Sequence, residues 1–194
     1  MAGKLIVLYG INNLGKSTQA KLLVDRLRDA GYSTTYLKYP IYELAPSGPL
    51  LNAYLREGNP LQLSPREAQI IYALNRFQYQ PEIEEQLAAD EWIVAEDYTG
   101  TGLAWGWGAG AKLNFLEAIN EGLLKPDLAL WLDGERFVSG IEQGHKHENN
   151  NQLMDKVREC HQQLAERYGW PRFDANQSID NLNDQLWRAV QVLF

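Results

Sequence analysis

Leu5 to Ser17 reads Leu-Ile-Val-Leu-Tyr-Gly-Ile-Asn-Asn-Leu-Gly-Lys-Ser, and this stretch decides the fold of the chain. Its apolar part, Leu5 to Tyr9, predicts a buried parallel strand. The remainder, Gly10 to Ser17, matches the pattern G-x-x-x-x-G-K-S/T, which binds the phosphates of a nucleoside triphosphate. A helical pattern follows over Ser17 to Ala30 and ends at Gly31. The motif therefore lies between a strand and a helix, which is the context that it requires.

Each residue type in this phosphate loop (Gly10 to Ser17) has a physical role in binding an anion. Gly10 and Gly15 allow a tight turn that points successive backbone N–H groups at the phosphates. The helix adds the positive end of its dipole, Lys16 reaches the β- and γ-phosphates, and Ser17 offers a hydroxyl to Mg²⁺. The alternative is a glycine turn that precedes a helix by chance. The expected ATP-binding residues are Gly10, Asn12, Asn13, Leu14, Gly15, Lys16, Ser17 and Thr18.

Composition and charge are those of an ordinary globular protein. The 194 residues are 45% hydrophobic and 22% charged, and the formal net charge is −7. A nucleic-acid surface needs clustered Lys and Arg, so we expect no nucleic-acid partner. The single cysteine, Cys160, fits a reducing compartment. Since there is neither a signal peptide nor a run of about 20 apolar residues, we expect a cytoplasmic protein without a membrane partner.

The rest of the chain alternates strand and helix patterns, which predicts an α/β fold with a parallel sheet. With no internal repeat or linker, we expect a single domain over residues 1–194. Residues 140–151 are polar and rich in Gly, His and Asn, which predicts a loop. Further strands are predicted at Thr34 to Tyr39, Trp92 to Ala95, Leu128 to Leu132 and Arg172-Phe173. Helices are predicted within 41–63, from Ser64 to about Tyr79, from Pro81 to Ala88, from Lys112 to Gly122, up to Tyr168, and from Ser178 to Val192.

Further segments narrow the class of protein. These are Tyr39-Pro40, Tyr72-Ala73-Leu74-Asn75-Arg76, Glu96-Asp97-Tyr98-Thr99-Gly100-Thr101-Gly102-Leu103-Ala104-Trp105 and Leu124-Lys125-Pro126-Asp127-Leu128. Their order and spacing resemble the thymidylate kinase family of nucleoside monophosphate kinases, from residue 4 to about 180. The resemblance implies a P-loop NTPase fold of three α/β/α layers, with a five-stranded parallel sheet and a lid loop at about 140–151. It also implies transfer of the ATP γ-phosphoryl group to a pyrimidine deoxynucleoside monophosphate, above all dTMP, with Mg²⁺ and a homodimer.

The acceptor site follows from this resemblance and from side-chain chemistry. Tyr72 and Arg76 share a helix face, so the ring would stack on a pyrimidine and the guanidinium would bind its phosphate or carbonyl. Packing in the helix core for Tyr72, and a solvated face or an ion pair for Arg76, are the alternatives. Thr101 would bond the base, while Tyr98 and Trp105 would exclude water or a ribose 2′-hydroxyl; each is equally consistent with packing. The expected substrate-binding residues are Tyr39, Tyr72, Asn75, Arg76, Asp97, Tyr98, Thr101, Gly102 and Trp105.

Metal binding is assigned to Ser17 and Glu96. Glu96 follows a predicted parallel strand, at the edge where ligand sites of α/β proteins lie, and its carboxylate would hold Mg²⁺ directly or through water. The alternative is that Glu96 and Asp97 are solvated loop acids. The expected catalytic residues are Lys16, Glu96 and Lys146.

Lys146 lies in the predicted lid, a segment that closes over phosphates and excludes water. A His-x-His metal site is the first alternative for this loop, with His145 and His147 flanking Lys146 and with Glu142 and Glu148 nearby. A solvated loop without a specific role is the second.

The chain also departs from the family's pattern. The family has Asp-Arg where this chain has Glu96-Asp97, and it has an acid where the phosphate loop has Asn12. Asn13 and Lys146 stand at the two positions where the family supplies an arginine for the transition state, and Tyr42 replaces another arginine. The residues expected to bind ATP, the phosphoryl donor, therefore match the family's pattern, whereas those expected to bind the acceptor nucleotide differ from it. A deoxynucleoside kinase and a non-catalytic ATP-binding module are the alternatives to a nucleoside monophosphate kinase.

Overall fold

The computed structural model describes residues 2–137 and 151–194. Its strands form one parallel sheet in the order β2-β3-β1-β4-β5. The strands are β1 (Leu5–Tyr9), β2 (Thr34–Lys38), β3 (Trp92–Glu96), β4 (Leu128–Asp133) and β5 (Arg172–Asp174). The helices are α1 (Lys16–Asp29), α2 (Ser47–Arg56), α3 (Pro65–Ala88), α4 (Thr99–Gly108), α5 (Leu113–Ile119), α6 (Asn151–Tyr168) and α7 (Ile179–Val190), followed by the 3₁₀ turn η2 (Gln191–Leu193).

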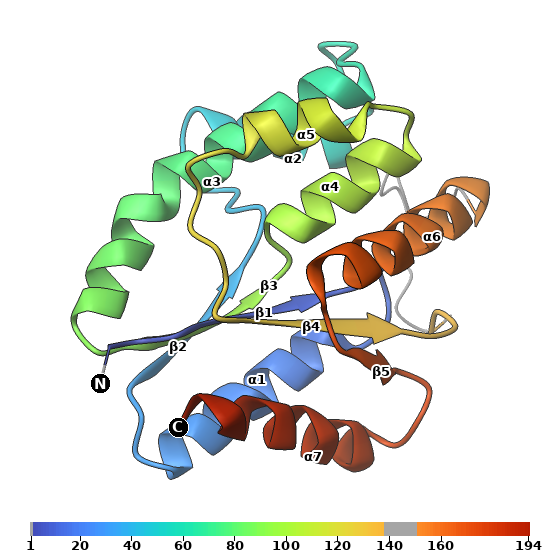
Figure 1. The fold of residues 1–194 in the computed structure, drawn as a ribbon. Helices are drawn as coiled ribbons and strands as arrows, with labels where there is room; N and C mark the ends of the chain where they lie inside the picture. Colours follow the sequence, from blue (N-terminus) through green and yellow to red (C-terminus); the bar gives the residue numbers. More distant parts are fainter. Residues whose placement is uncertain (1, 138–150) are drawn as a thin grey trace.

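Helices cover both faces of this sheet. Figure 1 shows α1 and α7 below it and α3, α4 and α6 above it. The β1 side chains explain why both faces are covered, since each of them is at most 1% exposed. Leu5, Val7 and Tyr9 pack into one core cluster, and Ile6 and Leu8 pack into the other. The predicted α/β fold with a five-stranded parallel sheet is confirmed.

Helix α3 is longer than the sequence predicts. It runs unbroken through Pro81, so the expected division into two helices near this proline was wrong. A proline removes one backbone hydrogen bond, and the surrounding contacts offset this loss. The Gln80 side chain donates to the carbonyl of Gly122 at 3.2 Å and accepts from the N–H of Leu124 at 2.9 Å. Ile83, one turn later, is fully buried.

Helix α4 has no counterpart among the predicted helices. It contains four glycines and follows Tyr98, so its helix propensity is poor. Close packing explains why it forms: a Cβ at Gly100 would overlap the rings of Tyr9 and Trp170, and a Cβ at Gly108 would overlap Val157. Tertiary contacts therefore override local propensity in this segment.

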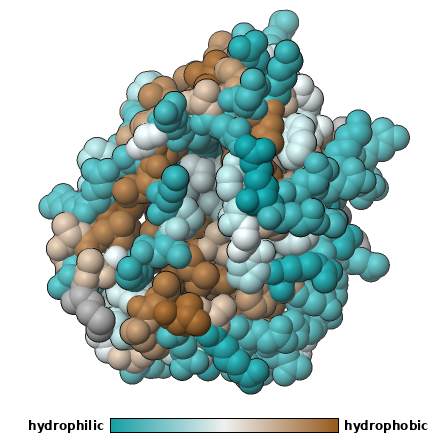
Figure 2. Space-filling view, in the orientation of Figure 1, coloured by the Kyte–Doolittle hydropathy of each residue, from teal (hydrophilic) through white to brown (hydrophobic). Residues whose placement is uncertain are grey.

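Polar residues cover most of the face that Figure 2 shows. On the face shown in Figure 2, hydrophobic residues gather over the region of α3 and, lower in the view, near the C-terminus. Within residues 2–137 and 151–194, no helix combines the length and apolar character that crossing a membrane would need.

Candidate functional site

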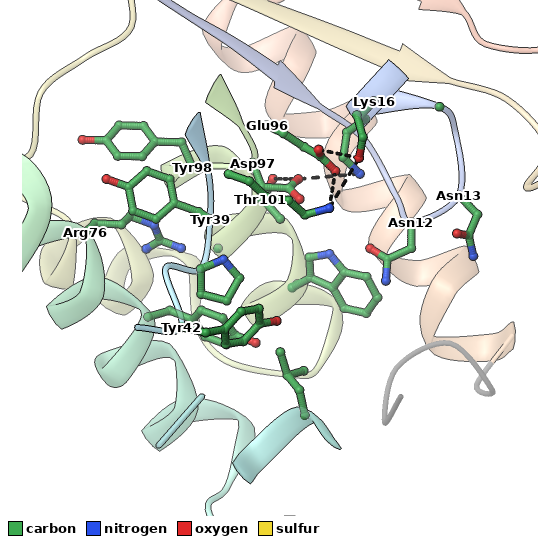
Figure 3. A pocket seen from close by; sticks show the side chains of 18 of the residues that line it. Asn12, Asn13, Lys16, Tyr39, Tyr42, Arg76, Glu96, Asp97, Tyr98 and Thr101 are labelled. Carbon is green, nitrogen blue, oxygen red and sulfur yellow. Dashed lines mark hydrogen bonds and ion pairs between the residues drawn. The ribbon is translucent and has the colours of Figure 1, made fainter. Parts of the chain in front are cut away.

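A cavity with a volume of about 470 Å³ opens at the carboxyl ends of β1, β2 and β3. These strands are neighbours in the sheet, so the residues that follow them lie together. Figure 3 shows Asn12, Asn13 and Lys16 at one end of the cavity and Arg76 with tyrosines at the other. The cavity therefore has a phosphate-loop end and an aromatic end, with acidic residues between them.

The phosphate loop has the backbone shape that its glycines predict. Gly10 has φ 141° and Gly15 has φ 78°, and a Cβ at Gly10 would overlap the carbonyl of Leu132. The ammonium of Lys16, which is 4% exposed, donates to the carbonyls of Gly10 and Ile11 at 2.9 and 2.8 Å. Lys16 is thus fixed against its own loop, beside the N–H groups that would receive phosphate oxygens.

Glu96 is a buried carboxylate surrounded by donors. The hydroxyls of Ser17 and Tyr36 each donate to its Oε2 at 2.6 Å, and Lys38 Nζ lies 3.1 Å from its Oε1. Burial raises the pKa of Glu96, but Lys16, Lys38 and the two hydroxyls together hold this pKa below its usual value. The side chain is therefore an anion at neutral pH.

Asp97 points into the same cavity and has different partners. It has φ 62°, a left-handed conformation that aspartate tolerates better than most residues. Its Oδ1 accepts a hydrogen bond from the hydroxyl of Thr101 at 2.8 Å and lies 3.6 Å from Lys16 Nζ. Burial raises the pKa of Asp97, opposed in part by Lys16. Asp97 therefore places a carboxyl group in the middle of the cavity.

Arg76 lies at the aromatic end of the cavity, among tyrosine side chains. It is 3% exposed, its Nη1 donates to Asn120 at 2.8 Å, and its Nε has no hydrogen-bond partner among the described residues. The rings of Tyr39 and Tyr98 lie beside it, 5.3 Å apart between centroids, and their buried hydroxyls also lack such partners (Figure 3). A buried guanidinium with an unused donor is suited to binding a polar group of a flat ligand.

Most residues predicted for the site line this one cavity. They are Asn12, Asn13, Gly15, Lys16, Ser17, Thr18, Tyr39, Tyr72, Arg76, Glu96, Asp97, Tyr98, Thr101, Gly102 and Trp105. Gly10 and Leu14 belong to the phosphate loop but are buried and do not line the cavity. Lys146 and the remainder of the predicted lid up to residue 150 lie outside the described residues.

Asn75 does not line the cavity. It is fully buried, and its amide exchanges two hydrogen bonds of 2.9 Å with the backbone of Ile41 while donating to Ser47 at 2.8 Å. The structure therefore gives Asn75 a positioning role: it fixes the segment between β2 and α2 that follows Tyr39.

Several lining residues were not predicted. Lys38 is the register partner of Glu96 across β2 and β3, so the alignment of two strand ends could have indicated it. Arg56 lies over the ring of Tyr42, 4.6 Å from its centroid, and only the tertiary fold brings these two together. The others are Pro40, Leu55, Gln69 and Phe137.

The residues at the phosphate loop fit a magnesium ion. Ser17 Oγ and Glu96 Oε2 lie 2.6 Å apart, and both are the hard oxygen donors that Mg²⁺ prefers. Among the described residues no group of three or more His, Cys, Asp or Glu could hold a metal. A site of one hydroxyl and one carboxylate is complete only when phosphate oxygens and water supply the other ligands, as is usual for Mg²⁺ beside a nucleotide.

Comparison with known proteins gives a consistent result. A family model described as thymidylate kinase matches residues 8–186. The chain is 31% identical to a thymidylate kinase of Synechococcus, covering 98% of this chain and 97% of that protein. It is 30% identical to human thymidylate kinase, covering 95% and 88%. A solved thymidylate kinase structure from Candida albicans superposes with a TM-score of 0.86 at 24% identity, covering 98% and 92%.

Proposed function

The chain belongs to the thymidylate kinase family, and on this premise we propose that it transfers the γ-phosphoryl group of ATP to dTMP. The observation that carries the proposal is that one cavity has two chemically different ends. Lys16 lies at the phosphate-loop end and Arg76 at the aromatic end, and both line the same space (Figure 3). A kinase needs this arrangement, because donor and acceptor must meet in line.

The donor end binds the triphosphate. The loop N–H groups and the start of α1 receive its oxygens, and Lys16 neutralises charge on the phosphoryl group in transfer. Ser17 and Glu96 would hold Mg²⁺, which neutralises developing charge on the phosphates when it is bound. No strong general base is needed, because a phosphate acceptor is already an anion.

The acceptor end binds the nucleotide. Arg76 offers its buried guanidinium to the base or phosphate of dTMP, and Tyr72 supplies an aromatic face. Tyr98, at 1% exposure, forms part of the wall, where it would exclude water or a ribose 2′-hydroxyl. Lys146 remains a prediction from the sequence for the lid.

A coupled assay of ADP release tests the function. We expect turnover with dTMP, weaker turnover with dUMP and none with thymidine, because thymidine brings no anionic acceptor. Turnover with thymidine in place of dTMP would instead identify a deoxynucleoside kinase. ADP or ATP binding without turnover for any of these acceptors would identify a non-catalytic binding module.

We further propose a homodimer that forms through α3. Ile70, Leu74 and Phe77 follow a helical spacing and are 48, 41 and 39% exposed, so they form an apolar stripe on one face. Light scattering during gel filtration should give twice the chain mass, and Leu74→Glu should give a monomer. A monomeric wild-type protein at micromolar concentration would contradict this part.

We also place the reaction in the cytoplasm. ATP is available there, and the single thiol of Cys160, buried and unpaired, would remain reduced.

A further inference from the structure

Lys38 lies beside the two oxygen atoms that are assigned to the metal. Its Nζ is 3.1 Å from Glu96 Oε1 and 3.4 Å from Ser17 Oγ. An ammonium and a divalent cation cannot share this position, because like charges at such distances repel each other strongly outside bulk water. A metal ion held by Glu96 and Ser17 would therefore have to displace Lys38 from this carboxylate.

Lys38 and Glu96, the two partners of this ion pair, differ in how easily their side chains can move. The Glu96 side chain is 6% exposed and holds three donors, so it is fixed. The Lys38 side chain is 52% exposed and belongs to the last residue of β2, so its flexible stem can turn without disturbing the sheet. When the carboxylate changes partner, Lys38 is the side chain that moves.

The acceptor side of the cavity needs a cation. Asp97 lines the cavity between its two ends, so an acceptor phosphate that meets the donor there would lie close to a carboxylate. Among the described residues, the cationic side chains that line the cavity are Lys16, Lys38, Arg56 and Arg76.

The other three cations each have a partner outside the metal site, although Arg76 also has an Nε without a hydrogen-bond partner among the described residues. Lys16 is bound by the phosphate loop, Arg76 donates to Asn120 at the aromatic end, and Arg56 stacks on Tyr42. Lys38 is the one whose partner in the structure is the carboxylate assigned to the metal.

We propose that Lys38 competes with the nucleotide-bound divalent cation for Glu96 and, once displaced, binds the phosphate of the acceptor. Binding of the metal nucleotide thereby prepares the acceptor site, since it frees the positive charge of Lys38 in the cavity that Asp97 also lines. The second half rests on the proposed function, whereas the first half needs only a nucleotide and a metal.

The first half is tested by calorimetric titration of Mn²⁺ into the ADP-bound protein. Lys38→Met should bind Mn²⁺ about fivefold more tightly than the wild type, which corresponds to losing one partly exposed ion pair. Lys21→Met is the matched control, since Lys21 lies over the Tyr36 ring and does not contact Glu96. Lys38→Arg should retain the wild-type affinity, because it keeps the competing charge. Equal or weaker Mn²⁺ binding by Lys38→Met would overturn the proposal.

The second half is tested by titrating dTMP into the protein loaded with ADP and Mn²⁺. Lys38→Met should bind dTMP about fivefold more weakly, and Arg56→Gln should change the affinity less than twofold. Weaker dTMP binding by Arg56→Gln alone would assign the acceptor phosphate to the cation stacked on Tyr42 and overturn this half.

The two proposals fail in different ways. Tighter Mn²⁺ binding by Lys38→Met supports the competition at Glu96 whether or not any acceptor is phosphorylated. Lack of turnover with dTMP would remove the proposed function and leave that competition standing.

Discussion

The two ends of the cavity are built by different means. The phosphate-loop end is made of backbone from one continuous stretch, Gly10 to Ser17, and its shape depends on positive φ angles at Gly10 and Gly15. The aromatic end is made of side chains from β2, α3, α4 and their connections. A backbone site retains its chemistry while its side chains vary. A side-chain site can change its charge when a single residue is substituted, and Asp97 gives this cavity a carboxyl group.

Removing the central charge of the donor end should give the largest effect. Lys16→Ala should lower kcat by about 10²–10³-fold, because it removes the fixed cation beside the transferred phosphoryl group. The coupled assay measures this loss, and dTMP affinity serves as the control, since it should change little. A loss of dTMP binding as large as the loss of kcat would show that the two ends are not separable.

The second effect is a pH dependence of the folding stability, caused by the buried His161 of α6. Burial lowers the pKa of His161 to about 4, and Lys16 contributes to this shift. The unfolded chain takes up this proton below about pH 6.5 while the folded protein does not. Stability from this group is therefore complete above pH 6.5 and falls toward pH 4, by about 2 kcal/mol at pH 5.

Urea unfolding at pH 7.5 and pH 5 measures this dependence. His161→Gln keeps a donor for the Val157 carbonyl and cannot titrate. Between pH 7.5 and pH 5, the free energy of unfolding of the wild type should fall by about 2 kcal/mol more than that of this variant. Equal losses would show that His161 is protonated in the folded protein.

A substitution at the aromatic end should act on the acceptor alone. A Cβ at Gly102 would overlap Nη2 of Arg76, whose Nη1 is held by Asn120. Gly102→Ala should therefore displace the guanidinium and raise the KM for dTMP about tenfold. The dissociation constant for ADP should stay within twofold of the wild type. A parallel loss of ADP affinity would mean that the two ends share their packing.

The fold class and the phosphate-loop end of the cavity can be predicted from the sequence. The strand, loop and helix of Leu5 to Asp29 form a local signal, so both the fold class and the donor end follow from one motif. The break predicted at Pro81 was wrong and α4 was missed, because the contacts of Gln80 with Gly122 and of Gly100 with Tyr9 are tertiary. Helix propensity depends on the local sequence alone, so it does not predict such contacts.

The aromatic end was predictable only in part. Tyr72 and Arg76 follow from helical spacing, and they line the cavity. Asn75, their neighbour, instead holds the backbone of Ile41, and Lys38 reaches Glu96 through strand register. Residue type and spacing alone do not show which way a side chain points.

The smallest predicted effect distinguishes two roles for Thr101. Its hydroxyl donates to Asp97 in the structure, whereas the sequence predicts a hydrogen bond to the base. If the Asp97 contact is its role, Thr101→Val should raise the KM for dTMP only about twofold to threefold, since one partly exposed hydrogen bond is lost. An increase of tenfold or more, measured by the same coupled assay, would assign the hydroxyl to the base.

The most direct test of the central claim is to follow the transferred phosphoryl group itself. The protein is incubated with ATP labelled in the γ-phosphate, Mg²⁺ and dTMP, and the products are separated by chromatography. We predict that the label appears in dTDP in proportion to the ADP formed, and that Lys16→Ala slows this transfer about 10²–10³-fold. Label released only as inorganic phosphate, or at a rate independent of dTMP, would contradict the account.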